Sequence, residues 1–327
     1  MVPSNSVASF QKALQQSKNL ILVAGAGLSA ASGIPTFRGA GGYWRSFQAT
    51  RLATPEAFDA NPGLVWQASF LTLVSTAHIH KLSSLVLPLP SRKVCNLVLS
   101  CKPNNAHHVI ARLLDPNYRS AVAPLATKCT LITQNVDGLS LRAQEVLQPV
   151  TGTLGNTTLE QGKIIEMHGR LLETLCTKCK HRNPDSRSPI CPALAGTELR
   201  TEAIMDDAGK RVPEAEIPSK DLPRCEKDGC GGLLRPGVVW FGESIPELNK
   251  IESLVEEADM CLVIGTSSVV YPAAGFADVV QDNGGKVAVF NIETSQGDQN
   301  ADFLFLGPCE RTLGEALGIE VPAMREL

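Results

Sequence analysis

The sequence predicts a doubly wound α/β fold, in which helices cover both faces of a mostly parallel sheet. Short apolar runs recur along the chain and read as buried parallel strands, namely 19–24, 129–133, 260–264 and 286–290. Helical patterns lie between some of these runs, at 248–258 and 273–281. Polar or glycine-rich segments follow the runs, where ligands of such sheets bind. The strand ends are therefore where we expect the functional residues.

Composition excludes several other classes of protein. The chain has 327 residues, of which 43% are hydrophobic and 19% charged, so it is neither largely disordered nor collagen-like nor a coiled coil. The 30 basic and 33 acidic residues give a net charge of −3 without a polybasic run. We therefore expect no direct binding to nucleic acid or to a membrane surface. No apolar stretch reaches the roughly 20 residues that span a bilayer.

The first residues allow two interpretations. Residues 7–16 predict a short helix, in which Phe10 and Leu14 would face the core of the folded domain. The first acidic residue of the chain is Glu56, and an acid-poor start with serines is also typical of a mitochondrial address. The first nineteen residues lack the apolar core of a secretory signal, so we expect an intracellular protein with reduced cysteines.

A glycine-rich loop follows the first predicted strand. Gly25, Gly27 and Ala30 fit the pattern G-x-G-x-x-G/A, which lets a backbone turn tightly beside a pyrophosphate. A plain tight turn is the alternative. Dehydrogenases place an acidic residue about 20 positions further on, and none occurs at 45–51, which argues against that class. Glu293, in the loop after the last predicted strand, is a candidate to bind the ribose instead; a polar strand end is the other interpretation.

Further polar segments follow other predicted strands. They are 134–137 and 265–267, and they would form one polar rim at the carboxyl edge of the sheet. His168 follows the strand-like run 163–167, and a histidine titrates near neutral pH, so it can accept a proton from a hydroxyl. Its position alone also fits a structural histidine. The other five histidines have no chemical context.

Four cysteines form two pairs with the spacing of a zinc site. They are Cys176, Cys179, Cys225 and Cys230. Two thiolate pairs complete a tetrahedral Zn²⁺ site without an open position, so we expect one structural zinc ion. Cys191 lies between the pairs without a close partner, and we interpret it as non-ligating. Cysteines 95, 101, 129 and 261 are expected to pack as small hydrophobic residues.

Taken together, the motifs resemble those of the sirtuins, which are NAD-dependent protein lysine deacylases. The matching segments are Gly25-Ala-Gly-Leu-Ser-Ala30, Gly33-Ile-Pro-Thr-Phe-Arg38, Gln134-Asn-Val-Asp137, His168-Gly169, the cysteine quartet, Val238-Val-Trp-Phe-Gly-Glu243, Gly265-Thr-Ser267 and Asn291-Ile-Glu293. The resemblance covers about residues 5–67 and 101–318. Four further segments resemble the desuccinylase-type branch, namely Gly39-Ala-Gly-Gly-Tyr-Trp-Arg45, Leu52-Ala-Thr-Pro55, Pro189-Ile-Cys-Pro192 and Ser268-Val-Val-Tyr-Pro-Ala273.

The resemblance implies roles for individual residues. The residues expected to bind NAD are Gly25, Ala26, Gly27, Ala30, Phe37, Arg38, Trp44, Gln134, Asn135, Asp137, Gly265, Thr266, Ser267, Asn291, Glu293 and Cys309. The glycine loop would hold the pyrophosphate, Asp137 and Asn135 would orient the nicotinamide and its ribose, and Cys309 would lie near the adenine. The residues expected to bind the substrate are Ala53, Val238, Val239, Trp240, Phe241, Gly242 and Glu243. Ala53 would leave room for an acyl group longer than acetyl.

The resemblance also implies a reaction. The amide oxygen of an acyl-lysine would attack the ribose carbon that carries nicotinamide, and His168 would act as general base, with Asn135 as the second catalytic residue. The expected products are nicotinamide, O-acyl-ADP-ribose and free lysine, with malonyl, succinyl and glutaryl groups removed readily and acetyl weakly. We expect acyl-lysine proteins as partners, a monomer, and a mitochondrial location, with cytosol or nucleus as alternatives. Two rival functions are a catalytically impaired NAD- or peptide-binding protein and an ADP-ribosyl transferase.

Residues 68–100 depart from the family pattern. The desuccinylase-type branch carries a Tyr and an Arg where this chain has Ser69 and Thr72, and that pair reads the acidic end of a succinyl group. The stretch 68–100 has no acidic residue and no clear helical period. One interpretation is a gene-model error that replaces a short helix, and the other is a true insertion at the pocket mouth.

The predicted domain organisation has three parts. An NAD-binding domain of Rossmann type would comprise 1–45, 125–169 and 236–327. A helical part of a smaller domain would comprise 46–124, and a zinc-binding module would comprise 170–235, which is rich in Cys, Pro, Gly and charge.

Overall fold

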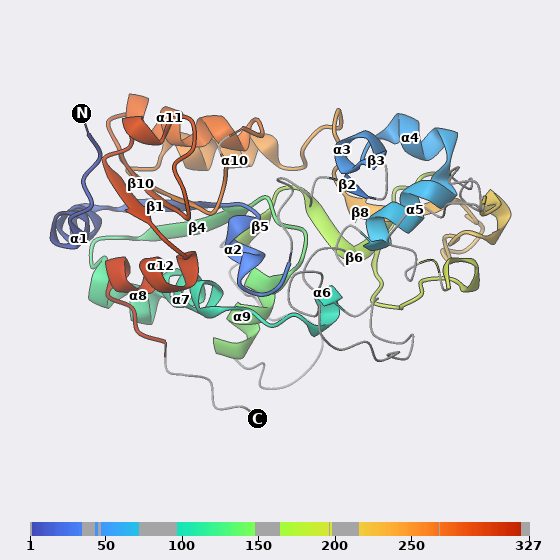
Figure 1. Ribbon diagram of the computed structural model, residues 1–327, viewed down its shortest axis with the longest axis horizontal. Helices are drawn as coiled ribbons and strands as arrows, with labels where there is room; N and C mark the ends of the chain where they lie inside the picture. Colours follow the sequence, from blue (N-terminus) through green and yellow to red (C-terminus); the bar gives the residue numbers. More distant parts are fainter. Residues whose placement is uncertain are drawn as a thin grey trace, which may run out of the picture. The chain divides into compact units, whose positions relative to one another are not determined.

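The computed structural model divides the chain into two compact units (Figure 1). The first unit comprises 1–32, 102–167 and 246–327, and the second comprises 33–101 and 168–245. The residues that the structure describes are 2–34, 43–44, 47–71, 97–147, 164–195, 197, 216–267 and 269–321. No helix among them is long and apolar enough to cross a membrane.

The first unit is built on a six-stranded parallel sheet with the strand order β11-β10-β9-β1-β4-β5. The strands are β1 (Asn19–Ala24), β4 (Lys128–Thr133), β5 (Ile164–Glu166), β9 (Met260–Ile264), β10 (Lys286–Asn291) and β11 (Phe303–Leu306). All four strands predicted from apolar runs are present. After β1 the chain adds β4 and β5 on one side of this strand, and then β9, β10 and β11 on its other side. The sheet is therefore doubly wound, as expected.

Helices cover both faces of this sheet, with α10 and α11 on one face and α7, α8 and α12 on the other (Figure 1). The helices of the unit are α1 (Val7–Gln16), α2 (Gly27–Ala30), α7 (Asn105–Leu114), α8 (Pro116–Val122), α9 (Leu139–Leu147), α10 (Leu248–Glu256), α11 (Phe276–Asp282) and α12 (Cys309–Leu317), with short 3-10 helices at Ala273–Gly275 and Asp298–Asn300. Apolar strands between two helical layers are buried on both faces, which explains their continuous hydrophobic runs.

The N-terminal helix α1 belongs to the core of the first unit. Phe10 and Leu14 are fully buried. The Phe10 ring packs edge-on against the rings of Phe290, Phe303 and Phe305, with centroid distances of 5.9, 5.5 and 5.4 Å. Residues 7–16 therefore form the first helix of the folded domain, one of the two interpretations that the sequence allowed.

The second unit contains a three-stranded antiparallel sheet with the order β7-β6-β8. Its strands are β2 (Tyr43–Trp44), β3 (Phe47–Gln48), β6 (Gly169–Cys176), β7 (Arg182–Pro184) and β8 (Leu234–Val238), and its helices are α3 (Ala49–Leu52), α4 (Pro55–Ala60), α5 (Pro62–Leu71), α6 (Leu97–Ser100) and short 3-10 helices at Pro192–Leu194 and Ser219–Asp221. The indole Nε1 of Trp66 donates to the carbonyl of Leu234 at 3.0 Å, which fastens α5 to β8.

The two units divide the chain differently from the expected domains. Residues 102–124 were expected with the helical part of the small domain, but α7 and α8 lie in the first unit. The reason is the apolar side of α7, where Val109, Ile110, Leu113 and Leu114 are at most 1% exposed in the core that covers the sheet. The division into an NAD-binding domain, a helical part and a zinc-binding module stays a prediction.

Candidate active site and zinc centre

The glycine loop after β1 packs backbone to backbone against the loop after β9. The amide of Gly25 donates to the carbonyl of Ile264 at 3.0 Å, and the amide of Gly27 donates to the carbonyl of Gly265 at 2.8 Å. A Cβ atom on Gly25 would lie 2.9 Å from the Gly265 oxygen, and one on Gly27 would lie 2.8 Å from the Gly265 Cα. A side chain fits at neither position, so the loop requires glycine for its own packing.

A buried polar cluster lies directly behind this loop. The Ser29 hydroxyl donates to Oδ2 of Asp137 at 2.7 Å and accepts from Nδ2 of Asn135 at 3.1 Å. Nδ2 of Asn135 also donates to the carbonyl of Gly25 at 3.1 Å, and Nε2 of His107 lies 3.5 Å from the Ser29 hydroxyl. The structure thus brings the predicted residues Asn135 and Asp137 to the glycine loop through Ser29 and His107, which the sequence analysis did not single out.

Burial changes the titration of two members of this cluster. It is the main cause that raises the pKa of Asp137, against hydrogen bonds from the Leu139 amide and from Ser29. Burial, with the nearby charges of His108 and Arg142, lowers the pKa of His107 to about 3. The cluster therefore holds a neutral imidazole near a carboxyl group whose ionised form is destabilised by burial.

The polar segments that end β4, β9 and β10 contact one another at the same edge of the sheet. Nε2 of Gln134, after β4, donates to Oγ1 of Thr266 at 3.1 Å. Nδ2 of Asn291, at the end of β10, donates to the carbonyl of Thr266 at 3.0 Å and to the Ser295 hydroxyl at 3.2 Å. The polar rim expected from the sequence is present in the first unit, and Glu293 stands exposed on it.

Cys309 begins α12 as a buried thiol. It is 5% exposed, and its Sγ contacts the carbonyl of Phe290 at 3.7 Å. Burial, helped by the charge of Glu310, raises the pKa of the Cys309 thiol to about 11. The thiol is thus a neutral group, and its place near the adenine stays a prediction.

Some of the residues expected to bind NAD lie outside the described part of the chain. Phe37 and Arg38 lie outside the described residues, and for Trp44 only the backbone in β2 is described. Ala26 and Ser267 are half-buried and Ala30 is exposed.

His168 lies at the point where the chain leaves the parallel sheet. In the first unit the amide of Met167 donates to the carbonyl of Thr133 at 3.0 Å. In the second unit the carbonyl of His168 accepts from the amide of Val239 at 2.8 Å. The next residue, Gly169, has a φ of +77°, and a Cβ there would lie 2.3 Å from a backbone oxygen. The backbone around His168 is therefore fixed on both sides.

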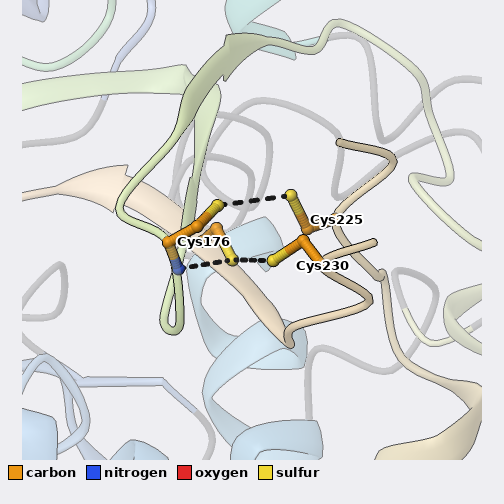
Figure 2. A group of neighbouring side chains, drawn as sticks. Cys176, Cys225 and Cys230 are labelled. Atoms are coloured by element: carbon orange, nitrogen blue, oxygen red, sulfur yellow. Dashed lines mark hydrogen bonds between the residues drawn. The ribbon is translucent and has the colours of Figure 1, made fainter. Parts of the chain in front are cut away.

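The four predicted zinc ligands form one cluster in the second unit, three of them labelled in Figure 2. The sulfur atoms of Cys176, Cys179, Cys225 and Cys230 all lie within 4.8 Å of one another. The Sγ atoms of Cys176 and Cys230 are 3.6 Å apart, and those of Cys179 and Cys225 are 3.8 Å apart. Zn–S bonds of about 2.3 Å in a tetrahedron require sulfurs separated by about 3.8 Å. The cluster therefore fits a structural Zn²⁺ ion, and Cys191 is not part of it.

The thiols of this cluster do not titrate alike. Burial raises the pKa of Cys176, but the amides of Cys179 and Lys178 and the neighbouring thiols outweigh it and lower the pKa to about 6. The Lys227 amide lowers the pKa of Cys225, but burial and the surrounding thiols outweigh it and raise the pKa to about 12. Four crowded sulfurs resist collecting four negative charges, and a divalent cation removes that obstacle.

The expected substrate segment 238–243 runs along the end of β8. The amide of Phe241 donates to the carbonyl of Ala53 at 2.9 Å, so the predicted pocket residue Ala53 lies beside this segment. Trp240 is 3% exposed and packs against Phe58, whereas Phe241 is 50% exposed. A side chain on Gly242 would extend into open space.

The acyl-reading positions are described only in part. For Ser69 only the backbone, which belongs to α5, is described. Residues 72–96, which include Thr72, lie outside the described residues. Both interpretations of 68–100 stay predictions.

Comparisons with known proteins assign the fold and the motifs to one family. A model of the Sir2 family matches residues 25–85 and 90–272. The match thus passes through much of the segment 68–100 and leaves out only 86–89.

The chain is similar to several curated deacylases. It is 41% identical to the mitochondrial NAD-dependent protein deacylase sirtuin-5 of Canis lupus familiaris, over 96% of this chain and 86% of that protein. It is 39% identical to an NAD-dependent protein deacylase of Daphnia pulex, over 97% of this chain and 98% of that protein. An NAD-dependent protein deacylase of Pyrococcus abyssi is 36% identical, over 97% of each chain.

Two solved structures share the fold. A Sir2 homologue in complex with NAD superposes with a TM-score of 0.67 at 30% identity, covering 97% of this chain and 95% of that one. A mutant Sir2 homologue in complex with 2′-O-acetyl ADP ribose gives a TM-score of 0.65 at 30% identity, covering 96% of this chain and 98% of that one.

Proposed function

The chain belongs to the Sir2 family, and from this premise we propose that it is an NAD-dependent protein-lysine deacylase. It transfers the acyl group of a modified lysine to ADP-ribose, releasing nicotinamide and O-acyl-ADP-ribose. The observation that carries this proposal is the convergence of Asn135, Asp137 and the Gly25–Gly27 loop through Ser29. Relatives at about 40% identity over almost the whole chain are named deacylases, which favours an active enzyme over a catalytically impaired binding protein.

NAD is a reactant in this proposal, and the residues of the first unit would hold it. The Gly25–Gly27 loop, whose glycines pack against the loop after β9, would turn beside the pyrophosphate. Asn291 is fixed by Thr266 and Ser295, so it and the exposed Glu293 would bind the adenosine ribose. Asp137 and Asn135 would orient the nicotinamide and its ribose, with Cys309 near the adenine.

The proton transfer falls to His168. After the substrate amide oxygen displaces nicotinamide from the ribose carbon, a ribose hydroxyl must lose its proton to attack the acyl group. A neutral imidazole suits this task near neutral pH. The fixed backbone around His168 and Gly169 would hold the ring in place.

The protein substrate would add as a strand along 238–243. The amides of Val239, Trp240 and Phe241 already donate within the chain, to His168, Glu243 and Ala53. The amide of Gly242 makes no hydrogen bond to any described residue, and Gly242 is exposed. Gly242 is therefore the donor in this segment that we assign to the substrate backbone.

We assign malonyl, succinyl and glutaryl groups as the acyl class, with acetyl as a weak substrate. The small side chain of Ala53 beside the substrate segment supports room for a long acyl group. Zinc stabilises the second unit and takes no part in the reaction. The vertebrate relatives are named mitochondrial, which supports a mitochondrial location, and we propose a monomer.

The test is direct detection of the product. The full chain is incubated with NAD and with acetyl-, malonyl-, succinyl- or glutaryl-lysine peptides, and O-acyl-ADP-ribose is measured by mass spectrometry. We expect the product in an NAD-dependent manner, with more from the acidic acyl groups than from acetyl. Consumption of NAD with ADP-ribose on protein, and without deacylated peptide, would favour ADP-ribosyl transfer instead.

A further inference from the structure

Arg235 in β8 is a buried arginine that the proposed chemistry does not use. The residue is 8% exposed. Its Nη1 and Nη2 donate to Oε1 and Oε2 of Glu243, each at 2.6 Å. Two parallel bonds between a guanidinium and a carboxylate fix orientation as well as distance. Arg235, the second residue of β8, and Glu243 therefore connect this strand to the far end of the turn that follows it.

The same pair fixes the residues between them. Nη2 of Arg235 donates to the carbonyl of Val238 at 2.9 Å, and Oε2 of Glu243 accepts from the amide of Trp240 at 2.9 Å. The guanidinium carbon lies 3.7 Å from the centre of the Trp240 ring, the geometry of a cation–π contact. Trp240 in turn is buried against Phe58, so the whole turn is anchored in the core.

The pair is ionised at neutral pH. Burial alone raises the pKa of Glu243, but hydrogen bonds from Arg235 and from the Trp240 amide outweigh it and lower the pKa. Arg235 is buried and Glu243 is half-buried, so removing one partner leaves the charge of the other poorly compensated. The turn is therefore sensitive to loss of either partner.

We propose that Arg235 is a positioning residue for the acyl-lysine substrate, because its pairing with Glu243 sets the turn 240–243 that would meet the substrate backbone. This inference rests on the proposed function and deepens it. Both carboxylate oxygens of Glu243 are occupied inside the chain, so Glu243 serves the substrate by shaping the turn. Gly242, at the centre of the turn with a φ of +86°, is the residue so presented.

The experiment compares three variants of the full chain. Arg235→Met removes the charge and both hydrogen bonds, and Arg235→Lys keeps a cation but loses the two-pronged geometry. The matched control is Arg187→Met, which removes another arginine that pairs with a carboxylate through two nitrogens in the same unit, at Asp185. For each variant, KM for an acyl-lysine peptide and KM for NAD are measured together with bound zinc and hydrogen exchange of the Trp240 amide.

The expected result separates the two substrates. Arg235→Met should raise KM for the peptide about tenfold or more, since a displacement of about 1 Å in a positioning group can cost on the order of 10²-fold. KM for NAD and the zinc content should stay at the wild-type values, and the Trp240 amide should exchange faster. Arg235→Lys should fall between Arg235→Met and wild type, and Arg187→Met should match wild type.

Two results would overturn the inference. One is an unchanged peptide KM in Arg235→Met, because the turn would then not depend on the pair. The other is a parallel rise of both KM values in Arg235→Lys, because that pattern belongs to general destabilisation. Failure of the proposed function is distinct, since it would appear as absence of deacylation in the wild-type chain rather than as a difference between variants.

Discussion

At the scale of single residues, the polar cluster at the glycine loop carries a cost in stability. Asp137 is 6% exposed, and its carboxyl group accepts from the Ser29 hydroxyl and from the Leu139 amide. Burial nevertheless raises its pKa, so the ionised form is less stable in the fold than in the unfolded chain. A residue kept at such a cost is typical of a functional site.

The titration of Asp137 makes a prediction about pH and stability. Because the folded pKa is raised, the folded state holds this proton more tightly, and the contribution of Asp137 to stability falls as pH rises from the unfolded pKa of about 3.9 to the folded pKa. Asp137→Asn removes this loss, so its free energy of unfolding relative to wild type should increase across that interval and then level off. Urea unfolding of both proteins at a series of pH values checks this. A difference that is constant with pH would contradict it.

His168 carries the second residue-scale prediction. His168→Ala should keep the fold and NAD binding but lose about 10²–10⁴-fold in deacylation rate, the usual cost of removing a general base. The matched control is His181→Ala, which removes an exposed histidine of the same unit. Turnover numbers and NAD affinity are measured for both variants. Near-normal turnover of His168→Ala would require a different base.

At the scale of elements, the zinc cluster ties two separate segments of the second unit together. Cys176 and Cys179 lie at and just beyond the end of β6, and Cys225 and Cys230 lie just before β8. Strands β6 and β8 pair in the same sheet, so one ion would close the end of that sheet. The cluster also borders the apolar core that contains Trp66 and Trp240.

Loss of one ligand should therefore destabilise the whole unit. Cys176→Ser should lose bound zinc and yield unstable protein, because a structural zinc site contributes on the order of 10 kcal/mol to folding. Cys191→Ser, outside the cluster, should keep one zinc ion per chain and normal stability. Metal analysis and thermal unfolding of both variants check this. Folded, active protein without zinc would contradict the assignment.

At the scale of the whole molecule, the residues expected to bind NAD match the family motifs, whereas the acyl-reading positions differ from the desuccinylase-type pattern. The cluster around Ser29 joins residues as far as 108 positions apart and is complete. Ser69 and Thr72 occupy the positions where the branch carries Tyr and Arg. We therefore expect acidic acyl groups to be preferred over acetyl by less than an arginine at position 72 would give.

This expectation can be tested by restoring the pattern. The preference of the chain for succinyl-lysine over acetyl-lysine should be modest, because no arginine stands at position 72 to pair with the succinyl carboxylate. The double variant Ser69→Tyr/Thr72→Arg should raise the ratio of kcat/KM for succinyl over acetyl about 10- to 100-fold, since a hydrogen bond to a charged group contributes about 1.5–3 kcal/mol. Strong succinyl preference of the unaltered chain would contradict the prediction.

The sequence by itself determined the parts of this protein that depend on local pattern. Continuous apolar runs gave four of the six strands of the parallel sheet, because strands covered by helices on both faces need no polar residues. Cysteine spacing predicted the zinc ligands, because two short pairs are sufficient to identify a tetrahedral thiolate site. The order of the motifs indicated the family that the comparisons then showed.

Only the tertiary structure decided which distant residues work together. Ser29 belongs to the polar cluster through contacts with His107 and Asp137, which lie far away in the sequence. Neither local periodicity nor motif spacing predicts such a contact. Arg235 is an ordinary strand residue in the sequence, and its pairing with Glu243 appears only when the chain turns back after β8. Helix α7 belongs to the first unit because its apolar side packs in the core that covers the parallel sheet. Hydrophobic periodicity reports that a face is buried, whereas the surface that buries it is set by packing of the whole chain.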